Sequence, residues 1–182
     1  SWYRRQRQMC IRDRERRGYL SAGAFVPEVV LEHPEVVSQL HREFIRAGTD
    51  IVQAFTYYGH REKLRLIGKE DLLEPLQKNA LQIAKDARDE FKDLDLLVCG
   101  DVANTNIYNP DDKKSHIECQ KMYEEQVGWA KEAGVDFIVA ETINWTGEMK
   151  IALKAIKDAG MIAVTNFSCL LYTSPSPRDQ SG

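Results

Sequence analysis

Apolar residues follow two alternating patterns along this chain. Stretches with apolar positions at helical spacing alternate with short apolar runs, and this alternation predicts helices and strands in turn. The predicted helices are residues 27–47, 71–91, 115–133 and 146–159. The predicted strands are residues 51–57, 94–102, 135–140 and 161–166. The elements therefore alternate as helix and strand, four times over.

Local signals indicate where two of these helices begin and end. His33-Pro34 predicts a break in the first helical stretch, and Gly48 provides its C-terminal stop. Ser115 is followed three positions later by Glu118, which is the spacing of a capping box. We therefore expect Ser115 to be the N-cap of the third helix.

The joint between helix and strand repeats three times. Its copies read AGTDIVQAF, AGVDFIVAE and AGMIAVTNF. In each copy Ala-Gly ends a helix, a strand follows, and a polar residue stands near the end of that strand. Recurrent strand–helix units with right-handed crossovers form a parallel sheet, open or closed. Since a closed TIM barrel needs eight strands, we expect an α/β fold that is part of a (β/α)8 barrel, with about four consecutive βα units.

Polar residues gather where the predicted strands end. A parallel barrel brings the carboxyl ends of its strands to one rim, so we expect a shared site there. In chain order the candidates are Thr56, Tyr57, Tyr58, His60, Asp101, Asn104, Thr105, Asn106, Tyr108, Glu141, Thr142, Thr165 and Asn166.

Four of these residues each allow two interpretations. Glu141 holds a cationic substrate group or acts as a base, or it is a rim carboxylate satisfied by backbone amides or a helix N-terminus. Tyr57 and Tyr58 form an aromatic wall for a cationic ligand, or they are packing residues. Asp101 pairs with Glu141 as a second carboxylate, or it belongs to a turn.

The composition argues against several functions. The apolar runs are shorter than the ~18 residues of a membrane span, and we expect no signal peptide. The chain has no GxGxxG and no P-loop, so nucleotide binding has no support. The cysteines form no CxxC pair, so we expect free thiols in a reducing, cytoplasmic compartment. They are Cys10, Cys99, Cys119 and Cys169.

The two ends differ from the sequence between them. Residues 1–14 are basic and residues 169–182 are rich in Ser and Pro, and both resemble translated adapter or vector sequence. We expect non-native or disordered flanks around one domain, residues 15–168; the alternative for the N-terminal arginines is a nucleic-acid-binding arm. The net charge is −3, and the flanks hold six basic and two acidic residues, so the domain carries −7. An acidic domain argues against nucleic acid as a partner.

Three segments resemble the homocysteine S-methyltransferase family and its betaine branch. They are ERRGYLSAG, HPEVVSQLHREFIRAGTDIVQAFTYYGHREKL and AGVDFIVAETI, within a resemblance that covers about residues 15–167. It implies a (β/α)8 barrel that transfers a methyl group from betaine or a sulfonium donor to homocysteine, giving methionine. It also implies a zinc ion held by cysteine thiolates, which keeps the acceptor sulfur deprotonated, and a homo-oligomer in the full-length protein.

The resemblance implies substrate-binding roles for five residues. Glu141 would hold the homocysteine amino group, Tyr58 would lie against the quaternary ammonium of the donor, and Tyr57 would belong to the same wall. Phe25 and Thr142 stand in that site where the betaine branch has tryptophan and tyrosine, which weakens the aromatic cage.

The resemblance also implies that parts of the barrel are missing. The first strand would precede Glu15, and the zinc cysteines would follow Ser168, because neither Cys99 nor Cys119 matches them and Cys169 falls in the flank. We therefore expect a fragment that is catalytically inactive.

Two alternative hypotheses stay open. One is a metal-independent (β/α)-barrel lyase or aldolase that uses Glu141 and Asp101 as acid and base. The other is a half-barrel that binds without catalysing.

Overall fold

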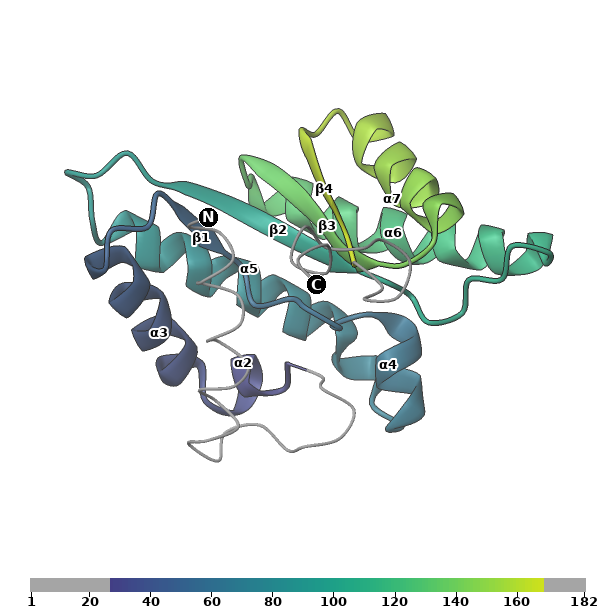
Figure 1. Cartoon of the computed structure of the whole chain (residues 1–182). Helices are drawn as coiled ribbons and strands as arrows, with labels where there is room; N and C mark the ends of the chain where they lie inside the picture. Colours follow the sequence, from purple (N-terminus) through teal and green to yellow (C-terminus); the bar gives the residue numbers. More distant parts are fainter. Residues whose placement is uncertain (1–26, 169–182) are drawn as a thin grey trace, which may run out of the picture.

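The computed structural model describes residues 27–168, which form a parallel sheet with helices packed along one face (Figure 1). Phe25 and both predicted flanks lie outside the described residues. In chain order the elements are α2 (Val29–Glu32), α3 (Pro34–Arg46), β1 (Ile51–Gln53), α4 (Arg61–Leu66), η1 (Glu70–Leu72), α5 (Leu73–Asp89), β2 (Leu97–Ala103), α6 (Lys113–Ala133), β3 (Phe137–Ile143), α7 (Thr146–Asp158) and β4 (Ala163–Phe167).

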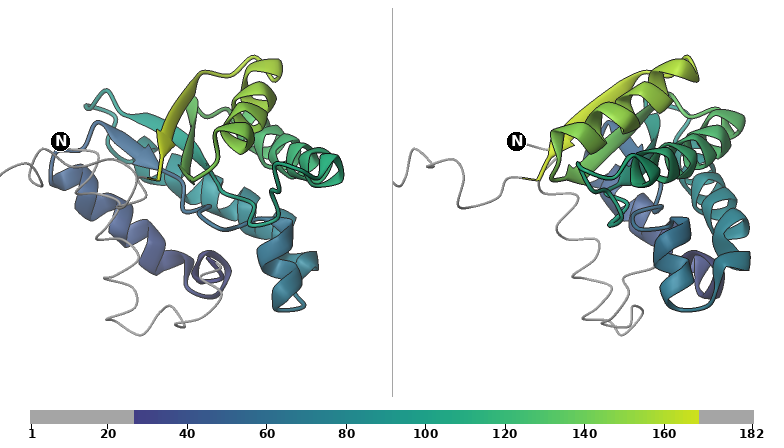
Figure 2. Two further views of the ribbon diagram at one scale, coloured as in Figure 1. Left: turned by 45° about the vertical axis from the view of Figure 1, so that its right-hand side comes forward. Right: turned by 90° about the vertical axis from the view of Figure 1, so that its right-hand side faces the viewer.

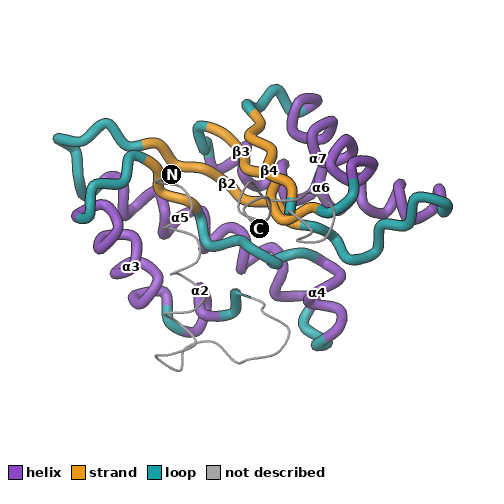
Figure 3. Tube along the Cα trace, in the orientation of Figure 1, coloured by secondary structure: helices purple, strands orange, loops and turns teal. Residues whose placement is uncertain are grey.

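The four strands lie in sequence order, β1-β2-β3-β4, and every neighbouring pair is parallel. Helix α5 connects β1 to β2, α6 connects β2 to β3, and α7 connects β3 to β4, so that the strand–helix units follow one another around the sheet (Figure 3). This arrangement confirms the predicted α/β fold with about four consecutive units of a barrel. Figure 2 shows α6 and α7 stacked beside each other on the same side of the strands.

Alternation along the strands separates two faces of the sheet. Val98 and Ile138 point to the helices and pack in one large cluster with Tyr123 of α6. Cys99 and Val139, one position further along, belong to a separate cluster on the opposite face. That second face is the inner face in a barrel, and residues at odd positions of β2 and β3 share it.

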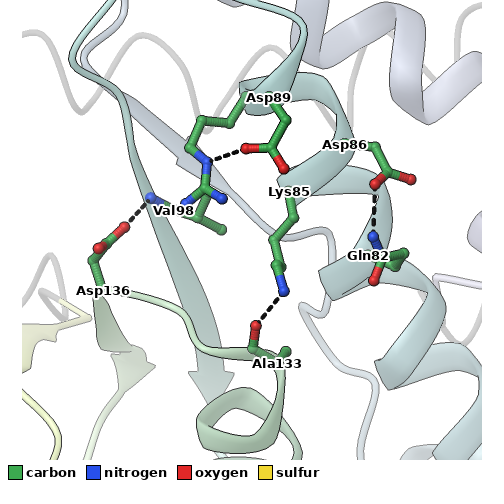
Figure 4. Close-up of polar contacts among 8 residues, drawn as sticks. Gln82, Lys85, Asp86, Asp89, Val98, Ala133 and Asp136 are labelled. Carbon is green, nitrogen blue, oxygen red and sulfur yellow. Dashed lines mark hydrogen bonds and ion pairs between the residues drawn. The ribbon is translucent and has the colours of Figure 1, made fainter. Parts of the chain in front are cut away.

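Asp136 fixes the register between β2 and β3 at their amino-terminal ends. Its carboxylate accepts a hydrogen bond from the Val98 N–H at 2.7 Å, and its own N–H donates to the Val98 carbonyl at 2.9 Å (Figure 4). Nearby, the Lys85 ammonium donates to the Ala133 carbonyl at 2.6 Å and ties α5 to the end of α6. If β3 slipped by one residue against β2, every one of its side chains would turn to the other face of the sheet. The contact at Asp136 therefore also helps to determine which side chains lie on each face.

The first strand is shorter than predicted, because the chain turns directly after it. β1 ends at Gln53, and the next residues form turns in which the Thr56 N–H donates to the Ala54 carbonyl and the Gly59 N–H to the Thr56 carbonyl. Helix α4, which the sequence pattern did not predict, begins immediately afterwards.

Two predictions about helix ends have different outcomes. The break at His33 is confirmed, since α2 ends and α3 begins on either side of it. The predicted N-cap Ser115 is wrong: α6 begins at Lys113, and Asp112 caps it by accepting a hydrogen bond from the Lys114 N–H. Ser115 is buried in the first turn, where its hydroxyl contacts the carbonyls of the loop before the helix.

β4 is the most exposed strand of the four. Among the described residues it pairs only with β3, and Val164 and Phe167 keep nearly half of their surface exposed. Within residues 27–168, no helix combines the length and the apolarity needed to cross a bilayer.

Candidate functional site

The register brings one polar residue from each strand to the inner face. Gln53 pairs with Cys99, Asp101 pairs with Val139, and Glu141 pairs with Ala103 on one side and Asn166 on the other. Because Cys99 and Val139 lie on the inner face, side-chain alternation puts these polar residues there too. They are Gln53, Asp101, Glu141 and Asn166.

Asp101 and Glu141 are the two acidic residues of this face, and both are buried, with exposed fractions of 3% and 2%. They lie on adjacent strands two residues apart in register, which corresponds to about 8 Å between their Cβ atoms. Low dielectric strengthens the attraction between a buried carboxylate and a cationic group. The inner face therefore places two buried acidic side chains on adjacent strands.

A bulge in β3 positions Glu141. The pairing of β3 with β4 shifts between Glu141 and Ile143. Without the shift Ile143 would share the inner face with Glu141, but it packs in the cluster on the helix side. The extra residue is Thr142, whose hydroxyl donates to the Glu141 carbonyl at 2.6 Å. The bulge thus turns the chain outwards directly after Glu141.

Within residues 27–168, three residues other than glycine adopt left-handed backbone, each at or after the carboxyl end of a different strand. Tyr58 has a φ of 57°, Asn106 of 66° and Thr142 of 55°. This conformation is a genuine outlier for β-branched Thr142, and such strain, of order 1–3 kcal/mol each, gathers at binding sites. Tyr58 and Asn106 lie in the loops after β1 and β2, and Thr142 lies directly before Ile143, at which β3 ends.

The two tyrosines after β1 lie against each other, with ring centroids 4.2 Å apart and planes tilted by 44°. The Thr56 hydroxyl donates to the Asp101 carbonyl at 2.9 Å, which holds this turn against the end of β2. Burial raises the pKa of Tyr57, while its hydrogen bond to Thr142 lowers it and the charge of Asp101 raises it. Tyr57 thus stays a neutral phenol beside Thr142 and Asp101, and the site brings these predicted residues together.

His60 is a member of the site whose role the sequence did not reveal. It is 1% exposed, its ring centroid lies 6.0 Å from that of Tyr58, and its Nδ1 accepts a hydrogen bond from the Lys63 N–H at 3.4 Å. The ring therefore caps α4 and supports Tyr58. Burial, and then the charge of Lys63, lower the pKa of His60 to about 4, so the imidazole is neutral at pH 7.

This depressed pKa predicts a pH-dependent stability. The unfolded imidazole binds a proton near pH 6.5, and the folded one only near pH 4. The neutral His60 therefore contributes fully to the free energy of unfolding above pH 6.5. As the pH falls to 4, that free energy decreases by about 2–3 kcal/mol. Urea unfolding at pH 7.5 and pH 4.5 measures this loss.

The matched variant for that measurement is His60→Asn, which keeps an acceptor at the N-cap. We expect it to show a smaller loss of stability on acidification than the parent chain. His33→Gln, at an exposed position, serves as the control for the replacement of a histidine as such. An unchanged pH dependence in His60→Asn would contradict the assignment.

A third buried carboxylate, Glu148, anchors the loop after β2. Its Oε1 accepts hydrogen bonds from the Thr105 N–H at 2.7 Å, from the Thr105 hydroxyl at 2.6 Å and from the Tyr123 hydroxyl at 3.2 Å. Glu148 lies in the first turn of α7, where the helix dipole favours a negative charge. Glu148 is not among the residues predicted from the sequence, although an acid three positions after an N-cap, here Trp145, is part of a capping signal.

Cys119 completes this network as a neutral thiol. Its sulfur lies 3.1 Å from the Thr105 hydroxyl, and burial raises the pKa of the thiol to about 11. Burial and the charge of Glu148 also raise the pKa of Tyr123. The Glu148 carboxylate therefore holds Thr105 as an acceptor, and the raised pKa values keep the Cys119 thiol and the Tyr123 phenol protonated, so that neither acts as a nucleophile.

The other residues predicted for the site lie in the loops or on β4 and are not buried on the inner face with Asp101 and Glu141. Tyr108 instead stacks on His116, with centroids 4.9 Å apart, and lies 6.3 Å from Trp145. Asn104 donates to the Asn106 side chain at 2.9 Å within the loop. Thr165 pairs with Ala140, whose side chain lies on the helix side, and is exposed; Asn166 lies on the inner face but is also exposed.

The described residues do not fit a zinc site. Within residues 27–168, no three histidine, cysteine or acidic side chains are placed so that they could hold a metal ion. Cys99 and Cys119 are buried free thiols in separate clusters, one on the inner face and one among the helices. Cys10 and Cys169 lie outside the described residues.

Comparison with protein families adds an independent finding. The family model described as homocysteine S-methyltransferase matches residues 9–180. The chain is 37% identical over 150 residues to betaine–homocysteine S-methyltransferase 1 of Mus musculus, across 80% of this chain and 36% of the mouse protein. It is equally identical to that enzyme of Sus scrofa, across 52% of the pig sequence. The chain thus spans about a third to a half of these curated relatives.

Solved structures show the same fold. The oxidized form of the homocysteine methyltransferase MmuM from Escherichia coli matches with a TM-score of 0.73 and 22% identity, over 90% of this chain and 60% of MmuM. The metallated form matches with a TM-score of 0.69 and 23% identity, over 85% of this chain and 58% of MmuM.

Proposed function

Because this chain belongs to the homocysteine S-methyltransferase family, we propose that it forms the part of such an enzyme that binds the amino group of homocysteine and the methyl donor. The observation that carries the proposal is Glu141, buried on the inner face at the end of β3 and held there by the bulge at Thr142. A methyl acceptor with a free ammonium group matches this carboxylate in charge.

The tyrosines supply the complementary half of the site. An onium group, either a quaternary ammonium or a sulfonium, is attracted to the face of an aromatic ring, and Tyr57 and Tyr58 present such rings beside β2. Betaine or a related onium compound is the donor that we propose. The relatives named for betaine support that choice, although Thr142 removes one ring that the betaine branch has.

The reaction is a displacement at the methyl carbon. The homocysteine sulfur forms the new S–C bond while the bond from the methyl group to the donor's nitrogen or sulfur breaks and leaves its electron pair on that atom. The donor loses its positive charge in this step. Glu141 and the tyrosines contribute binding and orientation, and they hold the two reactants at the carboxyl ends of the strands.

The sulfur must be deprotonated for this attack, and the described residues contain no cluster that would hold a metal ion for this task. Cys119 and Tyr123 have raised pKa values, and His60 is held inside the site wall. We propose that the 182-residue chain binds its substrates without turnover. The full-length protein would be a cytoplasmic, zinc-dependent homo-oligomer that makes methionine; the buried free thiols agree with a reducing compartment.

Binding of homocysteine tests the proposal directly. The chain is titrated by calorimetry with L-homocysteine and with 4-mercaptobutyric acid, which is the same molecule without its amino group. We expect homocysteine to bind at least about tenfold more tightly, because only it carries the ammonium group that Glu141 attracts. Equal affinity for both compounds, or no binding of homocysteine, would refute the proposal.

A metal-independent lyase remains the second candidate, because Asp101 and Glu141 share one buried face. Such an enzyme needs the carboxylates for proton transfer. Metal-independent turnover by the chain, lost in Glu141→Gln, would favour it over the methyltransferase.

A further inference from the structure

Lys63 holds its ammonium group over the ring of Tyr58. Its Nζ lies 4.3 Å from the ring centroid. Three other lysines of the described residues pair with carboxylates, Lys69 with Glu28, Lys78 with Glu74 and Lys154 with Asp158, whereas Lys85 donates to a backbone carbonyl. Lys63 has no carboxylate within ion-pair distance among residues 27–168. It is thus a cation that faces an aromatic ring and has no carboxylate partner among the described residues.

The neighbouring acidic groups are already engaged. Glu62, which precedes Lys63 in α4, binds Arg65 through two hydrogen bonds at 2.7 and 2.8 Å. Glu125 of α6 pairs with Arg61. Burial and the charge of Lys63 keep His60 neutral. Glu62 and Glu125 therefore do not draw the ammonium away from Tyr58.

The backbone of Lys63 is fixed while its side chain is free to swing. Its N–H is held by His60, which is buried and caps α4. The four-carbon stem beyond that point is flexible and ends in a strongly hydrated point charge. The ammonium group can therefore leave the ring and still remain at the edge of the tyrosine pair.

We propose that Lys63 makes the site selective for methyl donors that carry a carboxylate as well as an onium group. The proposal rests on the proposed function, in which Tyr58 receives the onium group. Two cations over one ring repel each other, so the donor's onium group must displace the Lys63 ammonium. A donor with a carboxylate then supplies an ion-pair partner to the displaced lysine, whereas a simple onium ion supplies none.

Two small probes separate these contributions. Glycine betaine carries both groups, and tetramethylammonium carries only the onium group; calorimetric titration of the 182-residue chain measures both. We expect Lys63→Met to weaken betaine binding about tenfold, because the partner of its carboxylate is lost. The same variant should bind tetramethylammonium about threefold more tightly, because the competing cation is gone.

The matched controls address charge and folding. Lys78→Met removes a lysine charge from an exposed position of α5 and should leave the affinity for both probes unchanged. Lys63→Arg keeps the cation and should keep the preference for betaine. Because Lys63 lowers the pKa of His60, its replacement by methionine should also raise that pKa in an NMR titration.

The outcome that overturns the proposal is an equal change, or no change, in the affinities of the two probes when Lys63 is replaced. The proposal is also overturned if the parent chain binds tetramethylammonium more tightly than betaine. If that chain still binds homocysteine, the proposed homocysteine site stands. Failure of the parent chain to bind homocysteine refutes the proposed function instead, and the ratio of the two probe affinities still decides the role of Lys63.

Discussion

Glu141→Gln should lower the affinity of the chain for L-homocysteine by about 30- to 1000-fold. The substitution keeps the shape of the side chain and removes its charge, so the ammonium group of the ligand faces a neutral amide in a buried position. Breaking a buried, hydrogen-bonded charge pair costs about 2–4 kcal/mol, and each 1.4 kcal/mol is a factor of ten. Calorimetric titration of the parent and variant chains measures the change.

Two control measurements distinguish a loss of ligand recognition in Glu141→Gln from a defect in folding. The affinity for 4-mercaptobutyric acid should differ little between parent and variant, because this compound brings no ammonium group to the carboxylate. Glu132→Gln, at an exposed position of α6, should bind homocysteine like the parent. A parallel loss of affinity for both ligands would assign Glu141 a structural role, and unchanged homocysteine binding would remove it from the site.

The end of β3 was the most predictable part of the molecule. A short apolar run with β-branched residues, closed by one carboxylate, indicates a strand buried on both faces whose last residue reaches the rim. The repeated helix–strand joint then predicts parallel neighbours. That geometry is why residues distant in sequence, such as Tyr57 and Thr142, are brought together. The prediction needed only the period of the strands and the direction of their ends.

Helix α4 was not predictable from periodicity. It is six residues long and buries a single side chain, Leu64, so it presents no repeat of apolar positions. Its N-cap is a histidine instead of the usual serine, threonine, aspartate or asparagine. The same segment holds His60 and Lys63, and their importance arises from contacts with Tyr58 that only the folded turn creates.

The start of α6 was predicted wrongly because the sequence offers two possible N-caps. Both Ser115 with Glu118 and Asp112 satisfy a local rule for a helix start, and they lie within one turn of each other. The structure uses Asp112, because the Ser115 hydroxyl contacts the carbonyls of Asn109 and Asp112 inside the loop. Sequence alone does not rank two such signals when the surrounding loop decides between them.

Glu148 shows how non-local packing changes the role of a residue. In the sequence it is an acid in the first turn of an amphipathic helix, where most acids are exposed. It is 2% exposed because the loop after β2 and Tyr123 of α6 close over it. No pattern within α7 contains that information.

Glu148→Ala should accordingly lower the free energy of unfolding by about 3–5 kcal/mol, the largest effect that we expect from one substitution on stability. It leaves the Thr105 N–H and hydroxyl buried without their acceptor, and a buried donor without a partner costs about 1–3 kcal/mol. The Tyr123 hydroxyl keeps its second acceptor, the Ala103 carbonyl at 3.1 Å, and so adds less. Urea unfolding monitored by circular dichroism measures the loss.

Glu148→Gln distinguishes hydrogen bonding from charge, because the amide oxygen still accepts from Thr105; we expect it to cost only about 1–2 kcal/mol. Glu124→Ala, on the exposed face of α6, should cost less than about 0.5 kcal/mol. Cys119 reports on the same network without denaturant, since its buried thiol should react with a thiol reagent faster in Glu148→Ala than in the parent. If Glu148→Ala lost no more stability than Glu124→Ala, the loop that carries Asn104, Thr105 and Asn106 would have to be held by other contacts, and Glu148 would have no part in positioning the rim.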